Sequence, residues 1–99
     1  MPVEPTPDGH YVLIKGIRWR ATDPDLPEDV SEILRHELMS ARRAVGVALR
    51  AADPEAEKAA RDRVQRTKVA LGERGTPWWE QTAPERRKRW EAVTRTLDS

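Results

Sequence analysis

Basic side chains interleaved with aromatic ones are the groups in this sequence best suited to bind a partner. One tyrosine and three basic residues lie within positions 11–20, and a second basic run occupies positions 86–89. Guanidinium groups suit phosphates, and an exposed aromatic ring can stack on a base. The pattern indicates a candidate nucleic-acid contact made of Tyr11, Lys15, Arg18, Arg20, Arg86, Arg87, Lys88 and Arg89.

Acidic residues close to the first basic segment offer a structural alternative. Four acids lie at positions 23–29, directly after Arg18 and Arg20. Arginine side chains can lie over a hairpin and pair with such acids, so we expect both arginines to hold this acidic connector while Trp19 anchors the hairpin on the helices. The net charge of +1 also argues against a strong general attraction to nucleic acid.

The tryptophans at positions 78 and 79 point to a protein partner. Adjacent residues cannot easily both face a core, so one ring is expected to pack inside while the other stays partly exposed. A half-exposed tryptophan beside an apolar seam is the kind of anchor that protein interfaces use. We therefore predict a protein interface at Trp78 and Trp79, and we assign Trp19 and Trp90 to the core.

Catalytic and metal-binding patterns are missing from the sequence. The absence of cysteine excludes disulfides, thiolate nucleophiles and cysteine-type zinc sites. The HELMS stretch at 36–40 begins like a zinc-protease helix, but position 40 lacks the second histidine that would share the metal. No serine lies in a glycine-flanked elbow, and the glycines are too dispersed to form a phosphate loop. A non-enzymatic protein without cofactor or metal is predicted.

The composition predicts one small domain with a thin core. The chain has 99 residues, of which 37% are hydrophobic and 35% are charged. Residues 1–9 are rich in proline and lack the regions of a signal peptide, so we expect a disordered or draped tail. The longest apolar run, AVGVAL at 44–49, is far shorter than the roughly 20 residues of a membrane span. A soluble cytoplasmic protein without a membrane partner is expected.

A β-hairpin at 10–21 is the first element that would position these residues. A two-residue Lys-Gly turn would pair Ile14 with Ile17 and Val12 with Trp19, which places four apolar side chains on one face. A bulge at the glycine would shift this pairing. Because a lone hairpin is not stable in water, its apolar face is expected to pack on the helices that follow.

Three helices complete the predicted fold. Apolar residues at three-and-four spacing predict helices at 27–52 and 54–71, which a short connection folds into an antiparallel hairpin. The alanines on their facing stripes would also suit a homodimer. A tryptophan-rich loop at 76–81 leads to a third helix at 83–97. The predicted class is α+β, mostly α: a two-stranded β-hairpin packed on an antiparallel helical hairpin plus a third C-terminal helix, in a single domain at 10–99.

Three strings of the sequence carry a resemblance to a group of proteins. IRWRATDP at 17–24, ELMSARRAV at 37–45 and ALGERGTPWWE at 70–80 together resemble small, largely uncharacterised actinobacterial proteins of about this length. Some of these are labelled "biopolymer transporter Tol", a label that suits this chain poorly because we expect neither a membrane anchor nor an export signal in it. The resemblance covers nearly the whole chain and implies a bacterial cytoplasmic origin without an activity. Such proteins are also associated with genes for DNA helicases and repair enzymes.

These observations favour a non-enzymatic protein-interaction or accessory module that binds an unidentified protein through Trp78 and Trp79. The alternative is a nucleic-acid-binding accessory factor, associated with DNA repair or a helicase, that uses the basic hairpin and the arginine-rich third helix. Binding to phosphates would weaken steeply with salt, whereas an apolar interface would hardly respond to it.

Overall fold

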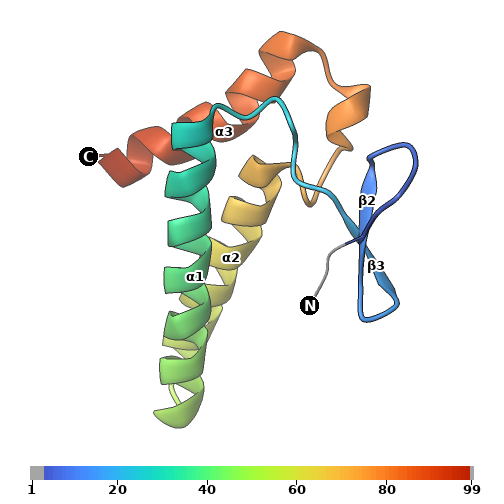
Figure 1. Ribbon diagram of the computed structural model, residues 1–99. Helices are drawn as coiled ribbons and strands as arrows, with labels where there is room; N and C mark the ends of the chain where they lie inside the picture. The colour runs from blue at the N-terminus through green and yellow to red at the C-terminus, as the bar shows by residue number, and fades with distance from the viewer. Residues whose placement is uncertain (1–3, 99) are drawn as a thin grey trace.

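The computed structural model describes residues 4–98, which form three helices with a small antiparallel sheet beside them (Figure 1). The mostly helical α+β class expected from the sequence is confirmed. In chain order the elements are β1 (Glu4–Pro5), β2 (Tyr11–Ile14), β3 (Ile17–Arg20), α1 (Glu28–Arg50), α2 (Pro54–Leu71), the 3-10 helix η1 (Trp78–Glu80) and α3 (Ala83–Asp98).

Capping residues fix where the helices begin and end. The Asp53 carboxylate accepts a hydrogen bond from the Ala56 N–H at 3.0 Å, so α2 begins directly after the short turn that follows α1. Gly72 ends α2 with a φ of +85°, a conformation that side chains other than glycine rarely adopt. Thr82 and Glu85 exchange hydrogen bonds at the start of α3, and this reciprocal pair forms a capping box.

The core lies where α1, α2 and α3 meet. Leu34 and Leu71 are fully buried there, and Trp90 of α3 packs against them from the side. Figure 1 shows α1 and α2 as an antiparallel pair, with α3 crossing the end at which α1 begins and α2 ends. The alanines of the two long helices, Ala41, Ala48 and Ala60, are buried within the chain. An Arg63 guanidinium from α2 donates two hydrogen bonds to the Glu37 carboxylate of α1, at 3.0 and 2.9 Å.

The pairing of β2 with β3 follows the predicted register. Ile14 lies opposite Ile17 and Val12 opposite Trp19. The two turn residues have φ values of +52° and +77°, so the tight two-residue turn forms without a bulge. This places the apolar side chains on one face of the sheet and Arg18 and Arg20 on the other.

The sheet has three strands, and the prediction of a two-stranded hairpin was wrong on this point. Glu4 pairs with Leu13 and Pro5 with Val12, which makes β1 an edge strand beside β2. A turn closed by hydrogen bonds between Thr6 and Tyr11 returns the chain to β2. The predicted tail at 1–9 is thus paired with the sheet from Glu4 on, while residues 1–3 lie outside the described part of the chain.

The apolar face of the hairpin is not packed on the helical hairpin as expected. Trp19 is 47% exposed and Ile17 is 57% exposed, so the assignment of Trp19 to the core was wrong. Figure 1 shows the sheet standing beside α2, next to the loop that carries η1. Contacts with that loop hold the sheet in place, and they leave the apolar face open.

Candidate functional site

Trp78 and Trp79 join the sheet to the helices. Trp78 is buried and donates a hydrogen bond from Nε1 to the Ala21 carbonyl oxygen at 3.0 Å. The Trp79 ring stacks on His10, with centroids 3.9 Å apart and planes only 2° from parallel. One ring is buried and the other half-buried, as the sequence predicted. Both rings make contacts within the chain, so the predicted interface pair forms a structural joint here.

Arg20 strengthens this joint from β3. Its Nη1 donates to the Gly75 carbonyl oxygen at 2.6 Å, and its guanidinium lies 5.8 Å from the centre of the Trp79 ring. Arg18 instead lies 4.4 Å over the Tyr11 ring. The expectation that these two arginines hold the acidic connector was therefore wrong.

Two arginines of α3 hold the acidic connector instead. The buried Asp23 carboxylate accepts hydrogen bonds from the guanidinium groups of Arg86 and Arg89, and also from the Asp25 N–H at 2.8 Å. Burial alone would raise the pKa of Asp23, but the hydrogen bonds from the two arginines outweigh it and lower this pKa to about 2. The carboxylate therefore remains ionised at neutral pH and binds the connector to α3.

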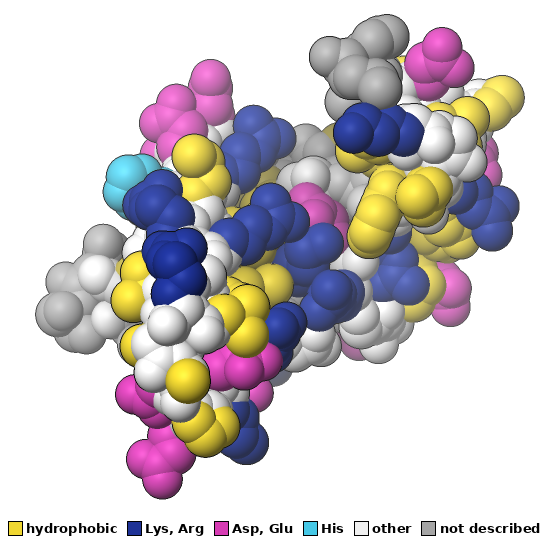
Figure 2. Space-filling model, turned by 90° about the horizontal axis from the view of Figure 1, so that it is seen from below, with side chains coloured by type: hydrophobic (Ala, Val, Ile, Leu, Met, Phe, Trp, Pro, Cys, Tyr) yellow, Lys and Arg dark blue, Asp and Glu magenta, His cyan; other side chains and the backbone are white. Residues whose placement is uncertain are grey.

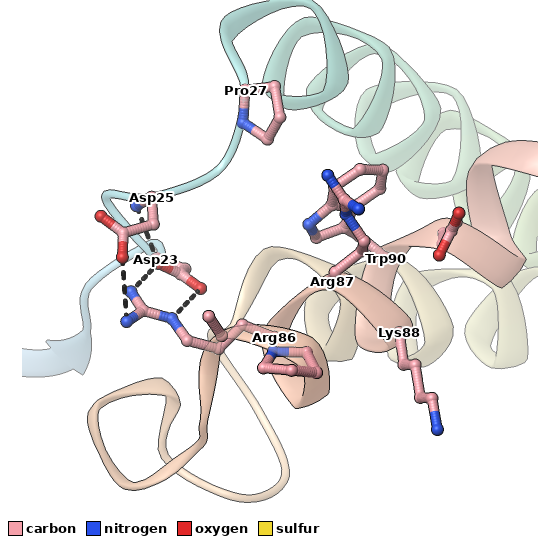
Figure 3. Close-up of a pocket in the computed structure, with 10 residues that line it drawn as sticks. Asp23, Asp25, Pro27, Arg86, Arg87, Lys88 and Trp90 are labelled. Carbon is pink, nitrogen blue, oxygen red and sulfur yellow. Dashed lines mark hydrogen bonds and ion pairs between the residues drawn. The ribbon is translucent and has the colours of Figure 1, made fainter.

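The basic run at 86–89 divides between the interior and the surface. Its first three residues line a cavity of about 510 Å³. Figure 3 shows Arg86 directed at Asp23 and Asp25, whereas Lys88 points away from them. Arg87 and Lys88 are exposed, while the Arg89 side chain is only 4% exposed and donates to the Gln81 side chain and the Ala70 carbonyl oxygen.

The predicted nucleic-acid residues therefore do not form one surface. Lys15 is exposed at the tip of the hairpin, and Tyr11 lies under the Arg18 guanidinium and makes a T-shaped contact with the Trp79 ring. The basic run at 86–89 lies in the first half of α3, and two of its four side chains, Arg86 and Arg89, pair with the acidic connector. The charges are thus distributed over two separate elements, and half of the charges of the 86–89 run are neutralised.

A groove lies between the apolar face of the sheet and the long helices. Its first part holds about 460 Å³ and its second about 560 Å³, and both parts share the side chains of Trp19, Arg42 and Lys68. Val12 and Ile14 of the sheet line the first part, and Val45 and Val64 of the helices line the second. We call this surface the groove below.

Cations outnumber acids in the groove. The Lys68 ammonium lies 5.4 Å from the centre of the Trp19 ring and 3.9 Å from a Glu73 carboxylate oxygen. Burial lowers the pKa of Lys68, and the nearby charges of Arg74 and Arg42 lower it further against the opposing effect of Glu73. Figure 2 shows Lys and Arg side chains in a band across this side of the molecule, with hydrophobic side chains on both sides of it.

The single acid of the groove is already engaged. Glu73 accepts a hydrogen bond from the Thr22 hydroxyl at 2.7 Å in addition to its ion pair with Lys68. The Arg42 guanidinium has neither a hydrogen bond nor an ion pair with any other residue in the range 4–98. The groove thus carries positive charge that the described residues do not neutralise.

Sequence reasoning missed the groove residues of the helices. Lys68 lies on α2 between the buried Thr67 and Leu71, where the apolar spacing gives no signal for a charged side chain. Arg42 is followed directly by Arg43, and Arg74 stands between Glu73 and Gly75 after the end of the predicted helix, so no pattern distinguishes either residue before the fold is known.

Among residues 4–98 there is no cluster of three or more His, Asp or Glu side chains that could hold a metal ion. Within the same range, every helix is too short or too polar to cross a membrane. No protein-family model, no curated protein and no solved structure matches this chain. Any statement about function therefore depends on the residues of the chain itself.

Proposed function

We propose that this protein is a binding module whose groove receives a segment of a partner protein that carries both apolar and acidic side chains. The observation that supports this most is the exposed Trp19 ring on an open apolar sheet face, opposite the cations Lys68 and Arg42. An occupant would cover the apolar face and bring carboxylates to the cations around the sheet. The role is one of binding, without a chemical step or cofactor.

The chemistry of the groove favours a protein over a nucleic acid. Val12, Ile14 and Ile17 extend the apolar surface beyond the one ring that could stack on a base, and they suit aliphatic side chains. One face of Trp19 already has the Lys68 ammonium nearby. Phosphate binding would also need a larger excess of cations than the net charge of +1 provides.

The proposal moves the interface away from the tryptophan pair predicted from the sequence. Trp78 and Trp79 position the sheet beside the groove and contact the partner little. Substituting Trp79 would thus weaken binding only by loosening the sheet, whereas substituting Trp19 would remove contact area directly.

Titration of 15N-labelled protein with a seven-residue peptide of alternating valine and glutamate tests this role. We expect saturable shifts of the Trp19 indole and Lys68 amide signals, and a loss of at least tenfold in affinity for Trp19→Ala. Val47→Ser is the matched control, because Val47 is a similarly exposed apolar residue outside the groove. If a single-stranded oligonucleotide shifts the same signals and binds more tightly than the peptide, with an affinity that falls steeply with salt, the nucleic-acid alternative is favoured. Absence of shifts up to millimolar peptide would contradict the proposal.

A further inference from the structure

The strand β3 is the open edge of the sheet beside the groove. In the strand order β1-β2-β3, β2 is central, and no strand within residues 4–98 pairs with the outer edge of β3. β3 contains neither proline nor a bulge, and three of its four residues are exposed. Such an edge presents unpaired backbone groups that can bind an extended chain.

The backbone groups of Arg18 and Arg20 are the ones that face this open edge. The Ala21 N–H donates to the His10 carbonyl at 2.9 Å, so positions 10 and 21 form a hydrogen-bonded pair. In an antiparallel ladder, hydrogen-bonded pairs alternate with pairs that are not hydrogen-bonded. The N–H and C=O of Trp19 and Ile17 therefore also point toward β2. The N–H and C=O of the intervening residues therefore point outward.

We propose that the partner segment of the preceding section binds as an added strand on the outer edge of β3. This inference rests on the proposed function and specifies how the segment is held. Hydrogen bonds to the backbone of Arg18 and Arg20 would supply affinity, and side-chain alternation would supply specificity.

The two faces of β3 dictate the chemistry of that strand. Neighbouring residues on adjacent strands project from the same face, so alternate side chains of the partner lie beside Ile17 and Trp19 and the others beside Arg18 and Arg20. Arg18 makes no hydrogen bond or ion pair with another residue of the described range, so its charge is free to meet a carboxylate. The matching strand alternates apolar residues with aspartate or glutamate.

A second copy of this chain does not fit the same edge. If two copies of β3 paired about a two-fold axis perpendicular to the sheet, side chains from the same face of each copy would lie next to each other. Arg18 of one copy would then lie opposite Arg18 or Arg20 of the other. Like charges directly opposite each other destabilise an antiparallel pair, so the arginines oppose self-association through β3 and favour an acidic partner.

The Arg18→Pro variant tests strand addition, with Arg18→Ala as its matched control. Both variants lose the guanidinium, but only proline also removes the outward N–H, and proline is tolerated on an edge strand. The probe is the valine–glutamate peptide, with preserved Trp19 and Ile17 amide signals as the check that each variant keeps the hairpin. We expect the proline variant to bind at least tenfold more weakly than the alanine variant.

Binding of N-methylated peptides to the wild-type protein gives a second measurement, which does not depend on whether a variant folds. Methyl groups on one set of alternate amides should abolish binding, whereas methyl groups on the other set should leave it nearly unchanged. Equal binding of both methylated peptides, with equal affinities of the two Arg18 variants, would overturn strand addition while leaving the groove as the binding surface. Absence of peptide binding by the wild-type protein would overturn both proposals. Concentration-dependent broadening of the Arg18 and Arg20 amides in the free protein would show self-pairing and overturn the choice of partner.

Discussion

The Asp23→Asn substitution is expected to lower the free energy of unfolding by about 3–5 kcal/mol, the usual effect of removing one partner from a buried ion pair. Asparagine keeps the size of the side chain but turns an NH2 group toward guanidinium donors. The buried Arg89 would lose its only carboxylate partner among residues 4–98. Because a domain of this length is stable by roughly 5–15 kcal/mol, the loss is a large fraction of the total.

Urea denaturation followed by tryptophan fluorescence measures this loss, and Asp25→Asn provides the control. Asp25 pairs with the same Arg86 at 3.0 Å, but its side chain is 71% exposed. Exposed ion pairs contribute up to about 1 kcal/mol, so the control variant should remain close to the wild-type protein. The contrast between the two variants isolates the effect of burial.

The pH dependence of stability gives an independent check on the same carboxylate. Folding lowers the pKa of Asp23 from 3.8 to about 2, so its ionised form stabilises the fold fully above its unfolded-state pKa. That contribution is lost as the pH falls through the folded-state pKa, and a shift of this size corresponds to about 2 kcal/mol. Between about pH 5 and pH 2, the stability gap between the wild-type protein and Asp23→Asn should shrink by this amount.

A stability difference between the wild-type protein and Asp23→Asn that stays below about 1 kcal/mol and does not change with pH would refute this reasoning. Asp23 would then act as an ordinary surface acid, and other contacts would have to hold the connector. These are the hydrogen bond from the Asp23 N–H to the Leu71 carbonyl oxygen, at 2.9 Å, and the ion pair between Asp25 and Arg86.

Three further predictions concern the joint and the groove. Gly72→Ala should lower the thermal stability more than Gly75→Ala does. Positive φ disfavours alanine by about 1–2 kcal/mol at both positions, but only at Gly72 would the new Cβ lie 3.0 Å from the Asp23 Cβ. Equal losses of stability in thermal unfolding would contradict this. Trp79→Ala should speed amide hydrogen exchange in β2 and β3 and leave exchange in the centre of α1 unchanged. The substitution removes the stacked pair with His10, which contributes about 0.5–1.5 kcal/mol beyond burial. An equal increase in exchange throughout the protein would count against this. Lys68→Met should leave chemical denaturation unchanged or shifted to higher urea, since burial and two arginines disfavour the ammonium. A destabilisation as large as that of Asp23→Asn would speak against it.

Local chemistry explains which parts of the fold were predictable. Asp53 and the capping box at 82–85 carry their signals within a few residues, and the helix ends follow them closely. The hairpin register follows from strict alternation on either side of a Lys-Gly turn. β1 has two residues, one of them proline, so it has no periodicity that could reveal it.

The candidate site was less predictable because its contacts join distant parts of the chain. Alternation shows which side chains share a sheet face, but it does not show whether another element covers that face. Asp23 lies near Arg18 and Arg20 in sequence, yet it pairs with Arg86 and Arg89, more than sixty residues later. The spacing of three residues between those two arginines places them on one side of a helix, and this is the signal that could have identified them.

In the groove, apolar burial and charge pairing differ from those in the rest of the fold. Folding alone gives no reason to expose the Trp19 ring, to bury the Lys68 ammonium next to two arginines, or to leave Arg42 without a counter-ion. All three features meet in one surface, beside an unpaired strand edge. Departures of this kind concentrate at functional sites. A strand added to β3 would cover the Trp19 ring with its apolar side chains, so its binding should raise the unfolding temperature of the wild-type protein and have much less effect on a Trp19→Ala variant.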